Sequence, residues 1–414
     1  MFFQRFLIQS VQVLMLIRNI ILTIIAVALS GCTLHLIAKE QNEVKVENEL
    51  KAQISDGPYI FVEGQSELSA FWLCQGKVVN KVIEAQNFPL MTSACNLPAK
   101  VHSITSLETN VLEYSGDFNI AALSDFHGQY DLMIELLINN HIIDKQKNWA
   151  FGNGHFVITG DVFDRGDKVT EILWFLYDLE RQAQQAGGKI HLTLGNHEVM
   201  ILNGDLRYLN PKYIEAAKQL NKPFEELFSK NNILGDWLRS KPVLVKVNDM
   251  LFAHGGFHPS LAIENHSLEE INSVFKANLV KAELALPRQG WGEYLHRSNG
   301  PIWYRGYFAK ERKKAPQAKS NKSKGSPPKD GGATSAEIDM LLKHFDVSHL
   351  VVGHTSQQQI ETRYQGRVIA IDSSIKRGQY GEILLIEKTS ADQQSIMWRG
   401  SLTGEKLPLH RDIK

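Results

Sequence analysis

Short apolar runs recur between residues 118 and 355, and each run ends in a group of polar residues. The five runs read FNIAALSDFHG, HFVITGDVFDRG, KIHLTLGNHE, DMLFAHGG and HLVVGHT. Between the first three runs the apolar residues follow helical spacing, as at Ile172, Phe175, Leu176 and Leu179. Buried strands that alternate with helices predict an α/β domain with βαβ connections. In such domains ligands bind beyond the carboxyl ends of the strands, where all five polar groups lie.

We assign this α/β domain to residues 116–400. The rest of the chain predicts smaller parts around it. Residues 58–115 hold short apolar runs broken by glycine, asparagine and proline, and predict a small, mostly β accessory domain. Residues 310–333 are rich in lysine and poor in apolar residues, which predicts a disordered basic insertion. This insertion is either a solvated loop or a segment that attracts anionic substrates or membrane surfaces. Residues 401–414 form a C-terminal tail.

The N-terminus shows a different pattern. An apolar run from Ile20 to Leu29 follows Arg18 and precedes the residues SGC, which end at Cys32. A basic residue, a short apolar stretch and small residues before a cysteine are typical of a secretory signal. The run is too short to span a bilayer alone. Because LSGC resembles the lipobox of bacterial lipoproteins, we predict a signal peptide with a lipobox over residues 1–32.

Lipidation of Cys32 would place the protein at the bacterial cell envelope. Residues 33–57 are polar and charged, as in AKEQNEVKVENELKAQ, and suit a tether. We therefore expect the protein to be anchored to the membrane through Cys32 and to face the periplasm. An uncleaved anchor is the alternative, and Met15 is a second candidate for the start of the chain, because MLIRN gives a compact basic region.

Charge and cysteine content narrow the possible functions. The chain has 45 Lys and Arg against 45 Asp and Glu, so we expect no nucleic-acid partner, and a monomer. Three cysteines leave Cys74 and Cys95 as a pair once Cys32 is lipidated, either bridged outside the cytoplasm or buried as free thiols. A cysteine-dependent phosphatase needs an arginine six residues after its thiolate, and Asn80 and Val101 occupy those positions.

The polar groups after the five apolar runs contain residues that bind metals. Imidazole, carboxylate and amide oxygen together suit Zn, Mn or Fe rather than calcium. A calcium loop needs oxygen ligands at alternate positions, whereas DVFDRGDKV has Val162 and Phe163 there. Two metals that share a carboxylate can generate a hydroxide at neutral pH and stabilise both oxygens of an in-line phosphoryl displacement. The candidates are Asp125, His127, Asp161, Asp164, Arg165, Asn196, His197, Glu198, His254 and His354.

The motifs SDFHGQYDL, GDVFDRG, GNHE, HGG and GHT resemble the signature of the calcineurin-like metallophosphoesterases. HGQYDL and GNHE indicate the phosphoprotein phosphatase (PPP) superfamily, and GPIWYRGYF with VVGHTS resembles its bacterial Shewanella-like subgroup. The resemblance spans residues 119–387 and implies a β-sandwich flanked by helices, in αββα layers. Ser124 replaces the usual glycine before the first aspartate, at a position without a ligand role, so we expect a small effect.

The resemblance also assigns ligands for two divalent or trivalent metal ions, of Mn, Fe or Zn. Asp161 would bridge the two ions. The first ion would be held by Asp125, His127 and Asp161, and the second by Asp161, Asn196, His254 and His354.

The remaining candidates would act on the substrate. Arg165 and Arg305 would hold the phosphate, with Asn196 beside them, because the guanidinium fork matches phosphate oxygens. His197 would act as general acid, and Asp164 would orient it and favour its protonated form. Glu198 would bond to backbone groups or to His197 instead of the substrate.

The expected reaction is hydrolysis of a phosphomonoester by a metal-bridging hydroxide, without a phosphoenzyme. The expected substrate is a phosphorylated protein or peptide, at phosphotyrosine, phosphoserine or phosphothreonine. The aromatic residues Phe257, Trp303, Tyr304 and Tyr307 either line a deep site for phosphotyrosine or pack in the core. The alternatives are a hydrolase of dinucleoside polyphosphates or other small phosphates, and a non-catalytic metal-binding lipoprotein. Arg165 and His197 argue against the last, because neither is needed to hold metal.

Overall fold

The structure, a computed structural model, describes residues 54–409 except residue 65 and residues 106–110, 311–331 and 389–394. The predicted signal peptide with its lipobox, most of the tether and nearly all of the basic insertion lie outside the described residues. The chain divides into two compact units, of which one comprises Met1–Ser55 with Gln75–Lys77. The other unit, Asp56–Cys74 with Val78–Lys414, contains the fold described below.

One sheet contains the predicted βαβ connections. Its strands β7 (Ile120–Leu123), β8 (His155–Ile158) and β9 (Lys189–Leu192) are parallel, and α2 (Tyr130–Asn139) and α3 (Val169–Gln185) connect them. The sheet has the order β17–β16–β15–β7–β8–β9. The strands β15 (Glu382–Lys388), β16 (Ser395–Ser401) and β17 (Lys406–Pro408) are antiparallel to their neighbours. The predicted end of the catalytic domain at residue 400 falls within β16, and the sheet continues beyond it.

The second sheet has the order β13–β14–β12–β11–β10–β6. The strands β11 (Met250–Ala253), β12 (His349–Val352) and β14 (Val368–Ala370) are parallel to one another. The sheet is completed by β10 (Leu244–Val247), β13 (Glu361–Arg363) and β6 (Glu113–Tyr114).

Alternate residues of these strands enter two different cores. In β7, Ile120 and Ala122 belong to a small apolar cluster, whereas Ala121 and Leu123 belong to the main one. The small cluster also takes residues from the second sheet, among them Phe252. Because side chains alternate between the faces of a strand, this shared layer lies between the two sheets. The predicted α/β sandwich with αββα layers is therefore confirmed.

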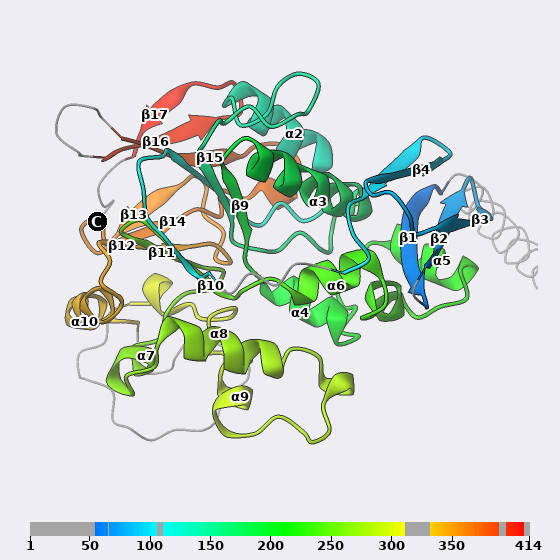
Figure 1. The fold of residues 1–414 in the computed structure, drawn as a ribbon. Coiled ribbons are helices and arrows are strands. Elements are labelled where there is room, and N and C mark those ends of the chain that lie inside the picture. The colour runs from blue at the N-terminus through cyan, green and yellow to red at the C-terminus, as the bar shows by residue number, and fades with distance from the viewer. Residues whose placement is uncertain (1–53, 65, 106–110, 311–331, 389–394, 410–414) are drawn as a thin grey trace, which may run out of the picture. The chain divides into compact units, whose positions relative to one another are not determined.

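Helices cover the outer faces of the sandwich. In Figure 1, α2 and α3 lie on the side of β15 and β9. The helices α7 (Ser260–Ile263), α8 (Leu268–Ala277) and α10 (Ser335–Phe345) lie on the side of β10, β11 and β12. Apolar residues on these helices, such as Leu176 of α3 and Leu341 of α10, join the main core. The α-helices that follow α3 among the described residues are α4 (Asn196–Leu202), α5 (Pro211–Gln219), α6 (Ile233–Arg239), α7 (Ser260–Ile263), α8 (Leu268–Ala277), α9 (Gly290–Tyr294) and α10 (Ser335–Phe345). The 3-10 helices there are η1 (Phe224–Phe228), η2 (Lys281–Glu283), η3 (Gly306–Phe308) and η4 (Ile375–Arg377).

Residues before β6 form the predicted small β region. The strands β1 (Asp56–Glu63), β2 (Glu67–Cys74) and β3 (Lys77–Glu84) form one sheet, and β4 (Leu90–Ala94) and β5 (Leu97–Val101) form a hairpin. A disulfide joins Cys74 to Cys95, as one of the two sequence interpretations predicts. Tyr59, Ile60 and Trp72 belong to the main core, so this region shares its core with α3 and α6.

Hydrogen bonds attach β1 to the helices. The indole of Trp174 donates to the carbonyl of Pro58 (2.9 Å), and the amide of Val62 donates to the carbonyl of Asn231 (2.8 Å). Within the described ranges, no helix combines the length and the apolar character that crossing a membrane requires.

Candidate metal centre

The predicted site residues lie in loops that follow parallel strands of both sheets. Backbone hydrogen bonds join these loops, from Asp125 to the carbonyl of Gly160 (3.2 Å) and from Gly353 to the carbonyl of His254 (2.8 Å). The loops after β7 and β8 supply Asp125 and His127, and Asp161 to Arg165. The first turn of α4, which follows β9, supplies Asn196 to Glu198, and the loops after β11 and β12 supply His254 and His354.

The backbone of these loops is left-handed at the functional residues themselves. The φ angles are 54° at Asp125, 41° at His127, 59° at Asp161, 72° at Asp164 and 64° at His354. A non-glycine residue held in this region costs about 1 kcal/mol or more, and such residues concentrate at functional sites. The loops therefore sacrifice stability in order to aim these side chains at one point.

Gly160 makes the close approach of two of these loops possible. Its φ is +90°, and an added Cβ would lie 2.3 Å from the amide nitrogen of Gly195. Only glycine fits there, so the loop that carries Asp161 can lie directly against the start of α4.

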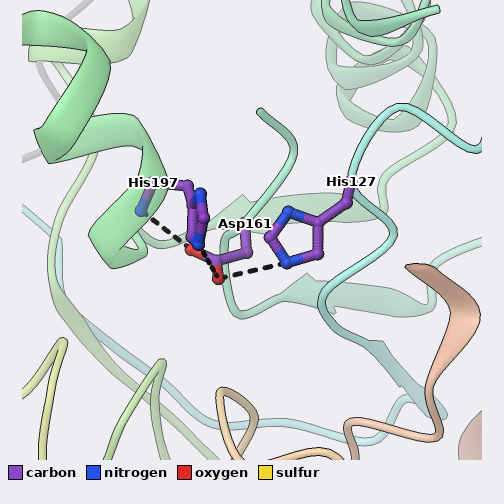
Figure 2. Close-up of side chains that lie close together, drawn as sticks. All are labelled: His127, Asp161 and His197. Atoms are coloured by element: carbon purple, nitrogen blue, oxygen red, sulfur yellow. Dashed lines mark hydrogen bonds and ion pairs between the residues drawn. The ribbon is translucent and has the colours of Figure 1, made fainter. Parts of the chain in front are cut away.

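Asp161 is shared by two groups of possible metal ligands. Its Oδ2 lies 3.5 Å from His127 Nε2 and 3.2 Å from His254 Nε2. One group consists of His127, Asp161 and His197, and the other of Asp161, His254 and His354. Figure 2 shows His127 and His197 on either side of the Asp161 carboxylate. All these residues are buried, as expected of a site that excludes bulk water.

Asp125 and Asn196 add one oxygen to each group. Asp125 Oδ1 lies 3.9 Å from His127 Nε2, and Asn196 Oδ1 lies 2.9 Å from His254 Nε2. Asp125 Oδ1 is buried and has no hydrogen-bond partner, although its other oxygen accepts from the amide of His354 (2.8 Å). An unpartnered buried carboxylate oxygen is costly unless a cation satisfies it. The residues present therefore fit a metal site.

Backbone contacts fix the tautomers of two histidines. His127 Nδ1 lies 2.6 Å from the carbonyl of Phe163, and His254 Nδ1 lies 2.7 Å from the carbonyl of Thr159. A carbonyl accepts only, so each Nδ1 carries the proton and donates it. Since Nδ1 is committed to a carbonyl, the Nε2 of each ring is the atom that faces Asp161 and that a metal would bind.

Burial and neighbouring charges shift the pKa values of His127, Asp161 and His254. Burial lowers the pKa of His127 to about 3, so its ring is neutral and able to coordinate. Burial also opposes charge on Asp161, but His254 and His197 outweigh it and lower the pKa of that carboxyl well below its usual range. For His254 burial is outweighed in turn by Asp161 and Asp125, which raise the pKa to about 9. A proton between His254 and Asp161 thus supplies positive charge where a metal would supply it.

Glu198 supports the loop of Asp161 instead of facing the site. Its carboxylate accepts hydrogen bonds from the amides of Asp161 (2.8 Å), Val162 (2.7 Å) and Gly195 (2.7 Å). The prediction that Glu198 bonds to the backbone is confirmed.

His197 contacts Asp164, its predicted partner, and also lies close to Asp161. Its Nδ1 donates a short hydrogen bond to Asp164, and its Nε2 lies 3.8 Å from Asp161 Oδ2. The ring belongs geometrically to the first ligand group, although its predicted role is proton transfer. Burial lowers the pKa of His197, but Asp161 and Asp164 outweigh this effect and raise it.

The two predicted phosphate-binding arginines differ in how they are held. Arg305 is half-buried, and its Nη1 donates to the carbonyl of His354 (3.1 Å) and the hydroxyl of Thr355 (3.0 Å). Arg165 is exposed, and its guanidinium carbon lies 5.2 Å from the ring centre of Tyr208. Arg305 therefore borders the second ligand group in a fixed position, whereas the ring of Tyr208 supports Arg165.

Ser124, at a position without a ligand role, touches a predicted ligand. Its hydroxyl donates a short hydrogen bond to the Asp125 carboxylate and accepts one from Thr159 (2.7 Å). The sequence could not predict this contact, because a glycine in the related motifs has no hydroxyl.

The aromatic candidates separate into core and site. Phe257, Tyr304 and Tyr307 are at most 1% exposed, and the Tyr307 hydroxyl donates to the carbonyl of Phe257 (2.8 Å), so these three pack in the core. Trp303 is half-buried with its ring centre 5.6 Å from that of His354. Tyr208 was not predicted as a site residue, and its ring centre lies 5.3 Å from that of His197. It lies in a loop without any motif, so no sequence signal marks it.

The fold and this ligand set are those of a metallophosphatase. Residues 118–358, more than half of the chain, match the family Calcineurin-like phosphoesterase. The chain belongs to the calcineurin-like phosphoesterase family, as predicted from its motifs.

Particular relatives lie among the Shewanella-like phosphatases. A cold-active protein-tyrosine phosphatase of a psychrophilic Shewanella species is 38% identical with a TM-score of 0.73, covering 86% of this chain and 99% of that chain. Shewanella-like protein phosphatase 1 of Plasmodium berghei is 29% identical over 261 residues, 62% of this chain and 67% of that protein. A symmetrical bis(5'-nucleosyl)-tetraphosphatase of Vibrio cholerae is 27% identical over 158 residues, 37% of this chain and 51% of that protein. The predicted resemblance to the Shewanella-like group is confirmed.

Proposed function

We propose that this chain is a phosphomonoesterase that uses two metal ions to dephosphorylate proteins. The observation that carries the proposal is the shared Asp161 carboxylate, which connects two buried groups of ligand atoms with arginines at their border. Two relatives described as a protein-tyrosine phosphatase and a protein phosphatase support a phosphorylated protein or peptide as substrate.

The proposed ligands are the six predicted from the sequence. Asp125 and His127 would hold one ion and Asn196, His254 and His354 the other, with Asp161 between them. Bound Mn, Fe or Zn ions would supply positive charge to the phosphoryl oxygens and activate water at neutral pH.

The other side chains bind the substrate and transfer a proton. Arg305, fixed through the His354 carbonyl, keeps further N–H donors for the phosphate. His197, oriented by Asp164, would give the proton of Nε2 to the oxygen of the leaving alcohol. Cys74 and Cys95 are bonded to each other, so no thiol of the described residues competes as nucleophile.

Replacing Asp161 with asparagine tests the proposal. We expect Asp161→Asn to lower kcat/KM for p-nitrophenyl phosphate by about 10³-fold or more, because the carboxylate shared by both ions is lost. Metal content, measured by mass spectrometry of the purified protein, should fall with it. Asp167→Asn, an exposed aspartate of the same loop, is the matched control and should behave as wild type. Near-wild-type turnover by metal-loaded Asp161→Asn would contradict the proposal.

The choice of substrate is tested on the same protein. Phosphotyrosine peptide, phosphoserine peptide and diadenosine tetraphosphate should be compared at equal concentration. The similarity to a dinucleoside tetraphosphatase makes the last compound the relevant rival. Faster hydrolysis of the dinucleotide than of either peptide would make a small-molecule phosphate, and not a phosphorylated protein, the proposed substrate.

We also propose the lipid anchor at the cell envelope, which rests on residues 20–32 of the sequence alone. Cys32→Ser should release the protein from the membrane fraction of cells that express it. Retention of this variant in the membrane would favour an uncleaved anchor instead.

A further inference from the structure

Tyr208 lies next to the side chain assigned as general acid. Its ring centre is 5.3 Å from that of His197, with the planes tilted by 45°. A general acid must lie within hydrogen-bond distance of the oxygen that leaves with the substrate's alcohol. A side chain beside His197 is therefore close to the place where the leaving group is expected.

The position of Tyr208 is fixed although its ring is exposed. The carbonyl of Tyr208 accepts from the amide of Arg165 (3.0 Å), and Asn210 Nδ2 donates to the carbonyl of Arg165 (2.8 Å). These two bonds hold the segment between α4 and α5 against the loop of Asp164 and Arg165. The residue nevertheless remains 44% exposed, whereas Phe228 further along the chain is fully buried. A large aromatic ring that is anchored and only half-covered can contact a ligand through its exposed part.

The surroundings of the ring suit an aryl group attached to a phosphate. The guanidinium carbons of Arg165 and Arg207 lie 5.2 Å and 5.6 Å from the ring centre. Arg207 is already paired with Asp205 through two hydrogen bonds, so Arg165 is the cation that is left to bind a phosphate. The ring thus has a phosphate-binding cation and the proton donor as neighbours.

We propose that Tyr208 forms the wall against which the leaving group packs, and that it selects phosphotyrosine over phosphoserine. The inference rests on the proposed function. Water supplies the new oxygen on phosphorus, the bond from phosphorus to the phenolic oxygen breaks, and the proton of His197 Nε2 goes to that oxygen. A phenyl ring in this place gains an aromatic contact that the methylene of serine cannot make.

Two substitutions and two peptides test the inference. The peptides have identical sequences and differ only in phosphotyrosine or phosphoserine, and kcat and KM are measured separately. We expect Tyr208→Leu to lower kcat/KM for the phosphotyrosine peptide about tenfold, mainly through KM, and for the phosphoserine peptide less than about twofold. Tyr208→Phe, which keeps the ring, should stay within about twofold of wild type on both peptides.

Binding of inert phosphonates gives a second readout that does not depend on turnover. Phenylphosphonate should inhibit the wild type about tenfold more tightly than methylphosphonate, and Tyr208→Leu should bring the ratio close to one. A merely structural role, acting through His197, would weaken both inhibitors and slow both peptides equally.

The possible outcomes separate the two proposals. Equal losses on both peptides, an unaffected phosphotyrosine peptide, or a Phe variant as impaired as the Leu variant would overturn the role of Tyr208 while phosphatase activity stands. If the metal-loaded wild type hydrolyses neither peptide nor p-nitrophenyl phosphate, the proposed function fails and this inference falls with it.

Discussion

At the scale of single residues, His197 combines two chemical possibilities in one ring. Its Nδ1 is committed to Asp164, while its Nε2 faces the shared carboxylate within the first ligand group. A metal ligand and a proton donor would use the same Nε2 atom, so the ring cannot be both at once. The presence of Asp125 and His127 for the same ion leaves Nε2 available for the substrate.

Replacing His197 distinguishes the two roles. We expect His197→Gln to lower kcat about 10²- to 10⁴-fold with metal content unchanged, because a proton donor is lost and the ligands remain. Metal analysis of the purified protein and turnover of a phosphopeptide give both quantities. His127→Gln is the control and should lose metal. Metal loss in His197→Gln to the extent seen in the control would make His197 a ligand.

At the scale of elements, the sequence predicted the strands that carry the chemistry better than the strands that complete the sheets. The runs before Asp125, Asp161 and His254 are mostly apolar and end in polar residues, so their strands and the position of the ligands could be inferred. The pairing of β15 with β7 could not, because residues 120 and 386 come together only through tertiary structure. For the same reason the burial of Tyr304 and the exposure of Tyr208 had no sequence signal.

His155 at the start of β8 and His191 within β9 form a pair of buried histidines. His191 Nε2 lies 2.9 Å from His155 Nδ1, and the ring of Phe118 stacks on that of His155 at 3.7 Å. Burial lowers the pKa of His155 to about 4, and that of His191 falls well below its usual value for the same reason. Both rings therefore stay neutral in the folded protein at pH values where the unfolded chain binds protons.

This pair predicts a loss of stability in mild acid. The contribution of the histidines is complete above about pH 6.5 and declines as the pH falls toward 4, because only the unfolded state takes up the protons. Between pH 7.5 and pH 5.5 we expect the Tm of the wild type to fall by about 3–6 °C more than that of His155→Gln/His191→Gln. Thermal unfolding at the two pH values measures this, and equal falls in the two proteins would contradict it.

At the scale of the whole molecule, the N-terminal β region is part of the support for the catalytic loops. Asp56 of β1 is buried and pairs with Lys212 of α5 (3.1 Å), and Lys212 also donates to the carbonyl of Asp167 (2.5 Å). The first strand is thus connected through one lysine to the loop that carries Asp164 and Arg165.

A fragment without this region should not fold stably. Residues 116–409 would lack Asp56, so Lys212 would lose its buried partner and keep only Glu171 as a paired carboxylate. They would also expose the surface that Tyr59 and Trp72 cover. We expect residues 54–409 to unfold cooperatively and residues 116–409 to aggregate or to unfold without a sharp transition. Size-exclusion chromatography and thermal unfolding compare them. A shorter fragment that is monomeric, with a Tm within a few degrees of the longer one, would show that the β region is dispensable.

The left-handed loops of the metal centre also limit which mutations the protein can accept. Aspartate, asparagine and glycine tolerate that conformation best, and the first two also carry side-chain oxygens that can bind a metal. At Asp125, Asp161 and Asp164 very few residue types therefore satisfy both the backbone conformation and the chemistry. A β-branched residue there would add the strain of its own backbone, about 1–3 kcal/mol, to the loss of chemistry. Selection should therefore remove such replacements because they lower the abundance of the folded protein as well as its activity. Sequence changes should accumulate instead at the exposed residues around the site, where Tyr208 lies.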